Sequence, residues 1–174
     1  MKKIFLFGLF SCITMLALAQ AGKKTIYAFK NKFSIEIPDD VDTMTAEQVQ
    51  TKYHKNKDPK IFYYANQDLS FSIVISAIAE DILEADMIKH KDELAKDFAV
   101  KGVKLDKNEV RQIGDHDVIV VSFSSDTPDS KILNRRFFAV AGGKLIMGTF
   151  NCTESESRTR LPQIDESINS IQIK

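Results

Sequence analysis

The chain has 174 residues, in which 24 lysines and arginines balance 24 aspartates and glutamates, and 44% of the residues are hydrophobic. A formal net charge of zero gives no basic excess for holding phosphates, which argues against a dedicated binder of nucleic acid or of anionic membranes. The length predicts one ordinary domain, large enough to bury a core without disulfides or structural metals.

The N-terminal residues predict export from a bacterial cell. A basic MKK start precedes an almost unbroken apolar run from Ile4 to Leu18, and Ala17-Leu18-Ala19 has the small-x-small form of a signal peptidase site. The run is shorter than the ~20 residues that a membrane-spanning helix needs. We therefore expect residues 1–19 to be a cleaved signal peptide and residues 20–174 to be a single domain, periplasmic or secreted, with no membrane span in its mature form.

Cys12 offers an alternative, because Leu9-Phe10-Ser11-Cys12 partly resembles the box of a lipoprotein whose cysteine is acylated. Phe10 is bulky where a small residue is usual, and the residues after Cys12 stay apolar, so this is the minority interpretation. Removing residues 1–19 takes away two lysines, which leaves 22 basic and 24 acidic residues and a formal net charge of −2.

The first half of the domain predicts a hairpin, a short helix and two further strands. TIYAFK and KFSIEIP form the hairpin, since Phe33, Ile35 and Ile37 alternate with polar residues. Thr45 is expected to cap a short helix that runs to Lys55, with Gln48 completing a capping box. The strands IFYYAN and LSFSIVISAIA follow.

A longer amphipathic helix comes next. Asp81 is its predicted cap, Glu84 stands at the capping-box position, and Gly102 stands where a C-terminal glycine belongs. The spacing of its apolar residues predicts one buried stripe, formed by Leu83, Met87, Leu94 and Phe98.

The second half predicts strands joined by short turns and then a final helix. VKLDKNEVRQI turns at Gly114-Asp115 into HDVIVVSFSS, and ILNRRFFAVA turns at Gly142-Gly143 into KLIMGTFNC. The segments VIVV and RRFFAVA are apolar at odd and even positions alike, which is typical of strands covered on both faces. The last helix is expected to begin between Ser157 and Arg160, because Pro162 is tolerated in a first turn, and its apolar stripe is Leu161, Ile164, Ile168 and Ile171.

These elements predict an α+β fold, in which an antiparallel β-sheet of about six to eight strands is flanked by two main helices plus a short helix. The order of FSIEIPDD, a small helix, a hairpin, an amphipathic helix, a meander ending in GKLIMGTFNC and a closing SINSIQI resembles the PsbP-like α/β/α sandwich. That fold is shared by the extrinsic subunit of the photosynthetic oxygen-evolving complex, a Ran-binding nuclear transport factor and some secretion adaptor chaperones. The resemblance covers residues 25–173 and implies a non-enzymatic binding or assembly protein.

Few residues suggest catalysis or metal binding. Cys152 is the lone cysteine of the mature chain and has no Cys-x-x-Cys or Cys–His motif, so we interpret it as a small packing residue at a strand end. Asp115-His116-Asp117 is a weak candidate for a cation site at a hairpin tip, and His90 with Glu93 is a weaker one on a helix face. Asp39, Asp40 and Asp42 lack the glycine and distal glutamate of a calcium loop and are read as turn residues. No cofactor is expected.

Arg135 and Arg136 are the most informative polar pair. Adjacent strand residues point to opposite faces, so at least one arginine faces a covered side of the sheet and needs a carboxylate or carbonyl there. This predicts either an ion pair under a helix or an arginine in a groove that meets a partner's carboxylate. Tyr53, Tyr63 and Tyr64 are candidates for an amphipathic patch nearby.

The sequence therefore favours an exported, non-enzymatic binding or assembly module whose partner is a protein of the bacterial cell envelope, not nucleic acid. The alternatives are a small envelope enzyme, hydrolytic or thiol-based, that uses Cys152 or a histidine, and an inhibitor or immunity-type protein.

Overall fold

The computed structural model describes residues 22–89, 91–93, 105–127 and 130–174. The expected signal peptide, Cys12, His90 and the distal part of the predicted amphipathic helix, with Leu94, Phe98 and Gly102, lie outside these residues. The elements are, in chain order, β1 (Lys23–Ala28), β2 (Phe33–Pro38), β3 (Asp42–Thr43), α1 (Ala46–Tyr53), β4 (Phe62–Ala65), β5 (Phe71–Glu80), α2 (Glu84–Lys89), β6 (Leu105–Ile113), β7 (His116–Asp126), β8 (Lys131–Ala141), β9 (Lys144–Thr153), η1 (Glu154–Glu156), α4 (Ser157–Asn169) and β10 (Gln172–Ile173).

The described strands form two antiparallel sheets, which confirms the predicted α+β class. The large sheet has seven described strands in the order β3-β4-β5-β9-β8-β7-β6, and the small sheet has the order β1-β2-β10. The predicted first hairpin is correct, but it lies in the small sheet. Its third strand, β10, comes from the C-terminus, so the small sheet joins the two ends of the domain.

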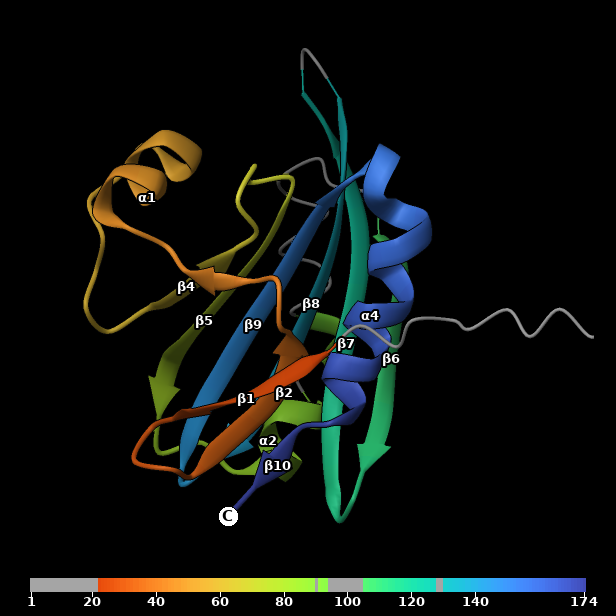
Figure 1. Cartoon of the computed structure of the whole chain (residues 1–174). Coiled ribbons are helices and arrows are strands. Elements are labelled where there is room, and N and C mark those ends of the chain that lie inside the picture. The colour runs from red at the N-terminus through yellow and green to blue at the C-terminus, as the bar shows by residue number, and fades with distance from the viewer. Residues whose placement is uncertain (1–21, 90, 94–104, 128–129) are drawn as a thin grey trace, which may run out of the picture.

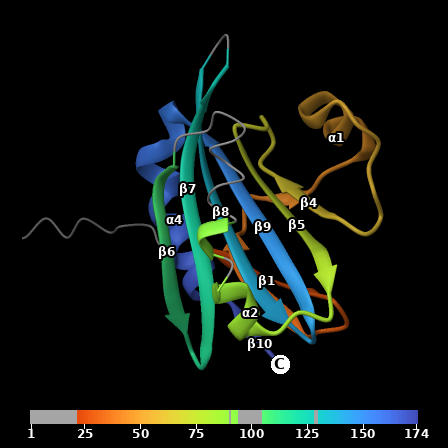
Figure 2. The same ribbon diagram turned by 180° about the vertical axis from the view of Figure 1, so that it is seen from behind.

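Both faces of the large sheet are covered, as the two-sided apolar strands predicted. Figure 1 shows α4 and the small sheet in front of the large sheet, and Figure 2 shows α2 on the reverse side. On the first side, Val118, Val120 and Phe137 pack with Ile164 and Ile168 of α4 and with the buried side chains of β2. On the second side, a separate cluster surrounds Met87 of α2, with Ile119, Val121, Phe123 and Phe138 from the sheet.

The short helix α1 is capped as the sequence predicts. The hydroxyl of Thr45 accepts the backbone N–H of Gln48, and the side chain of Gln48 accepts the N–H of Thr45, at 3.1 and 2.8 Å. His54 ends the helix in a left-handed conformation. Val49 anchors α1 in a third apolar cluster with Met44 and Tyr63.

The start of α2 differs from the prediction. Asp81 has φ of +57° and does not cap the helix, which begins at Glu84. The carboxylate of Glu84 is not part of a capping box, because it accepts the backbone N–H of Asp117 at 2.8 Å and contacts Nδ1 of His116 at 2.9 Å. Leu83 is 68% exposed, so it does not share the buried stripe with Met87, which is 3% exposed. Glu84 therefore contacts the β6–β7 turn instead of completing the predicted capping box.

The C-terminal helix follows a single 3₁₀ turn, η1, and begins at Ser157, inside the predicted window. Pro162 lies in its second turn, one turn later than expected. The buried face of α4 contains Ile164 and Ile168, which are fully buried, and Arg160, which is 6% exposed. None of the helices in the described ranges is long and apolar enough to cross a bilayer.

Candidate functional site

An ion-pair cluster lies between α4 and the β6–β8 side of the large sheet. Nη1 of Arg135 on β8 contacts Oδ2 of Asp165 on α4, and Nη1 of Arg111 on β6 lies 2.8 Å from the other oxygen of Asp165. Nε of Arg111 lies 2.6 Å from Oε1 of Glu109, whose Oε2 lies 2.7 Å from Nζ of Lys107. Arg135 therefore forms the ion pair under a helix that the sequence predicted.

The charges of this cluster do not balance. Lys107, Arg111 and Arg135 supply three positive charges, whereas Glu109 and Asp165 supply two negative charges. Burial alone would raise the pKa of Asp165, but hydrogen bonds from Arg135 and Arg111 outweigh burial and lower it. Asp165 is therefore ionised near neutral pH, and one carboxylate is shared between two guanidinium groups.

A groove of about 290 Å³ opens beside Arg135. Asp106 and Lys107 of β6, Leu133 of β8 and Leu161 of α4 line it together with Arg135 and Ser122. Ser122 and Arg135 are cross-strand partners in the β7–β8 register. The Oγ of Ser122 and the Nε of Arg135 are buried and have no hydrogen-bond partner among the described residues. The groove thus has charged and apolar walls, and it borders two hydrogen-bonding groups that no described residue pairs with.

Arg136 points to the opposite face of β8. Its Nε donates to Oγ1 of Thr149 at 2.9 Å, and its guanidinium carbon lies 5.6 Å from the ring centroid of Phe123. Burial lowers the pKa of Arg136. The adjacent arginines therefore occupy different environments, as the alternation of a strand requires.

The three predicted tyrosines lie at the other end of the large sheet, because β5 and β9 separate β4 from β8. Tyr63 is 1% exposed, and its ring packs against Tyr53 of α1 with centroids 5.8 Å apart. The Tyr53 hydroxyl donates to Ser72 at 3.1 Å. Tyr64 faces the other side of β4 and packs, half-buried, against the main core. The structure does not bring these tyrosines to Arg135 and Arg136, and the role of the set in partner binding stays a prediction.

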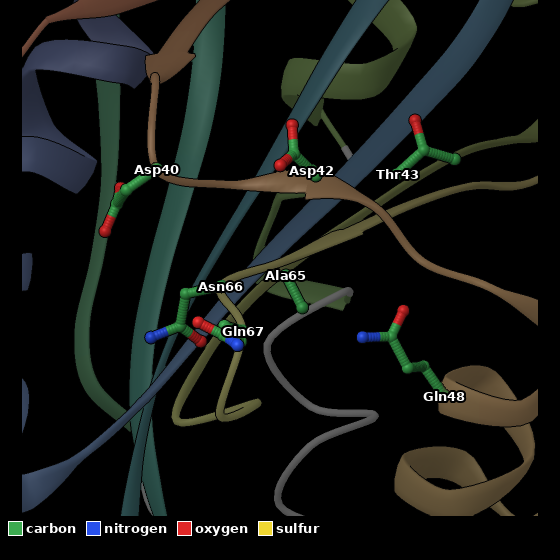
Figure 3. A pocket seen from close by; sticks show the side chains of 7 residues that line it. All are labelled: Asp40, Asp42, Thr43, Gln48, Ala65, Asn66 and Gln67. Atoms are coloured by element: carbon green, nitrogen blue, oxygen red, sulfur yellow. The ribbon is translucent and has the colours of Figure 1, made fainter.

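Two adjoining hollows of about 370 and 340 Å³ share Asp40, Asn66 and Gln67. Figure 3 shows the Asn66 and Gln67 amides together at the β4–β5 turn, with Gln48 of α1 across from them. Asn66 is already engaged, since its Oδ1 accepts the N–H of Phe71 and its Nδ2 donates to Ser70, both at 2.9 Å. Asp40 is paired with Arg160. These polar groups therefore hold the turn and the helix in place.

The predicted cation site at Asp115-His116-Asp117 is part of a helix–hairpin contact. Glu84 of α2 holds both the His116 ring and the Asp117 backbone. Within the described ranges, no three His, Cys, Asp or Glu side chains cluster in a way that would hold a metal ion.

Cys152 is a fully buried residue of β9, at 0% exposure, in the main core. Burial raises the pKa of its thiol, and the negative charge of Glu156 adds to the shift, against smaller opposing effects of Arg135 and Arg160. A thiol of this kind is protonated and shielded near neutral pH. The interpretation of Cys152 as a packing residue agrees with this environment.

The sequence analysis missed Arg111, Glu109, Lys107, Asp165 and Arg160. Arg111 and Glu109 follow each other at the period of two of a strand, which is the signal that places them on one face. The contact of that face with Asp165 has no local signal, because it depends on how α4 crosses the sheet.

No protein-family model matches the chain, and no curated protein matches it in sequence. Solved structures do match. The cyanobacterial PsbP protein CyanoP of Synechocystis sp. PCC 6803 is 14% identical with a TM-score of 0.59, over 91% of this chain and 96% of that one. LpqN of Mycobacterium tuberculosis, described as involved in cell envelope biogenesis, is 12% identical with a TM-score of 0.50, over 89% and 92%.

A protein of Bacteroides thetaiotaomicron VPI-5482 is 15% identical with a TM-score of 0.58, over 87% of this chain. The present chain spans about half, 48%, of that protein's length. Likenesses at these identities concern the fold alone. The chain has the PsbP-like fold.

Proposed function

We propose that this protein is an exported, non-enzymatic binding or assembly module of the bacterial cell envelope, and that the groove beside Arg135 receives a carboxylate of a protein partner. The observation that carries the proposal is the cluster under α4, in which three cations share two carboxylates, next to an open groove that Asp106 also lines.

A carboxylate suits this groove for two reasons. Arg135 shares Asp165 with Arg111, whereas Arg111 also pairs with Glu109. Guanidinium groups bind carboxylates with strong, directional hydrogen bonds. Leu133 and Leu161 add an apolar wall. A protein interface usually combines apolar contacts at its centre with polar contacts at its rim.

The setting in the envelope is supported by the basic start and short apolar run of residues 1–19 and by the fold shared with LpqN. Thiol-based catalysis is the weaker alternative, because Cys152 is fully buried and its pKa is raised. A nucleophilic cysteine needs an accessible thiolate.

The test is a comparison of affinity-tagged variants in pull-downs from envelope extract, with recovered proteins quantified by mass spectrometry. Lys107→Glu reverses a charge in the groove, and Lys60→Glu makes the same change at an exposed residue before β4. We expect a partner that binds the wild type and Lys60→Glu but is recovered roughly tenfold less with Lys107→Glu. Equal recovery with both variants, or no enriched partner, would contradict the proposal.

Arg135→Lys gives a second arm, since it keeps the charge near Asp165 but removes the planar fork that binds a carboxylate with two bonds. For an identified partner, titration should show weaker binding to Arg135→Lys while its unfolding curve stays near that of the wild type. Unchanged affinity of Arg135→Lys for the partner would show that the groove is not part of the binding site.

A further inference from the structure

The strand β6 lies at one edge of the large sheet. Within the described residues its only strand neighbour is β7, and the two ribbon views show it at the outside of the sheet (Figures 1 and 2). The outward N–H and C=O groups of an edge strand are a template for pairing with another strand. The start of this edge borders the groove of the proposed function, because Lys107 of β6 lines that groove. The inference rests on the pairing of β6 and does not depend on that function.

The regular part of this edge is symmetric about one residue. The β6–β7 pairing is irregular between Leu105 and Lys107 and then continues without a break to Ile113. Val110 is the middle residue of the segment from Lys107 to Ile113. It is 39% exposed and is one of the few large apolar side chains that the described surface exposes.

The charged residues on either side of Val110 are complementary between two copies of β6. If two copies of β6 pair antiparallel with Val110 opposite Val110, Glu109 of each copy faces Arg111 of the other, and Asn108 faces Gln112. A shift by two residues in one direction places Glu109 opposite Glu109 and Lys107 opposite Arg111. A shift in the other direction places Arg111 opposite Arg111. Opposite charges across a strand pair stabilise it and like charges destabilise it, so the strand selects the register centred on Val110.

We propose that a second copy of this chain occupies the β6 edge, with a two-fold axis at Val110 that joins the two large sheets into one. Each copy then contributes the same surface to the interface, as in most symmetric dimers. Paired residues share a face of the sheet, so the Glu109–Arg111 pairs lie on the α4 side and the two Val110 side chains lie together on the other side.

The first test is sedimentation equilibrium of the purified protein over a range of concentrations. We expect a monomer–dimer equilibrium that Val110→Asp weakens about tenfold or more, because it replaces an apolar pair on the axis by two like charges. Ile78→Asp is the matched control, since Ile78 is 47% exposed on β5, an interior strand, and it should leave the equilibrium unchanged. A protein that stays monomeric at every concentration overturns the proposal.

The second test does not depend on how Val110→Asp folds. Directly opposed residues in an antiparallel pair have Cα atoms about 4.5–5.5 Å apart, within the range for a disulfide. Val110→Cys should therefore form a covalent dimer on oxidation. Gln112→Cys, which faces Asn108 in this register, should not cross-link to itself, and the native Cys152 is buried. If the protein dimerises but Val110→Cys forms no covalent dimer on oxidation, pairing between copies at this edge is refuted. It is also refuted if the β6 edge pairs only with a strand of a different protein.

Discussion

Arg160 of α4 and Asp40, which follows β2, form a two-pronged ion pair, with Nη2–Oδ2 and Nη1–Oδ1 distances of 2.8 and 3.2 Å. The Arg160 side chain is 8% exposed and that of Asp40 is 50% exposed. The guanidinium carbon lies 4.7 Å from the ring centroid of Phe71. This pair connects segments 120 residues apart in the sequence and holds the C-terminal helix to the loop after the first hairpin.

Asp40→Asn should destabilise the fold, because it leaves the buried Arg160 guanidinium with Glu156 as its remaining carboxylate. We expect a loss of about 1–3 kcal/mol in chemical denaturation, below the cost of breaking a fully buried pair because Asp40 is half exposed. Asp39→Asn is the control, since Asp39 is exposed and adjacent. Equal losses for the two variants would show that the ion pair contributes nothing.

The ion pairs of Asp165 should make the folded protein less stable in acid. Burial raises the pKa of Asp165 in the folded protein, but hydrogen bonds from Arg135 and Arg111 lower it further than burial raises it. The ionised carboxylate therefore stabilises the folded protein at pH values above the ordinary aspartate pKa of about 3.9. The stabilisation is lost as pH falls through the folded pKa. The difference in unfolding free energy between wild type and Asp165→Asn should therefore narrow from about pH 6 to about pH 3. A constant difference would be inconsistent with the ion pairs. Glu166→Gln is the neighbouring control, because it removes only the exposed ion pair with Lys23.

Cys152 should react slowly with thiol reagents in the folded protein and rapidly in denaturant, because it is fully buried and burial raises its pKa. Cys152→Ala should retain partner binding. Labelling rates followed by mass spectrometry test the first expectation. Rapid labelling of folded protein at about pH 6, with loss of binding, would instead indicate an activated thiolate and return the thiol-based enzyme to consideration.

Gly148 should not tolerate a side chain. It pairs with Phe137 across β8 and β9, and a Cβ at Gly148 would lie 2.0 Å from Cε1 of the Phe137 ring. Because Phe137 is fully buried, Gly148→Ala should cost about 1–3 kcal/mol by overpacking. The same substitution should cost less in a Phe137→Leu background, where the smaller side chain leaves room. A double-mutant cycle with no coupling between the positions would show that the ring moves aside freely.

The sequence by itself determined the local elements. The capping box at Thr45, the glycine turn after β8 and the two-sided apolar strands each depend on residues that are neighbours in the chain. They were therefore visible as spacing. The same alternation placed Arg135 and Arg136 on opposite faces and predicted an ion pair under a helix for one of them.

Only the tertiary structure decided which distant groups meet. Glu84 fits a capping box locally, but the β6–β7 turn offers it the His116 ring and the Asp117 N–H, so the local signal misled. Tyr63 and Tyr64 lie far from Arg135 because β5 and β9 separate β4 from β8 in the sheet. Asp165 reaches Arg111 and Arg135 only because α4 crosses the sheet above them. Such contacts depend on how helices and strands pack against one another. This packing produces no periodic pattern in the sequence.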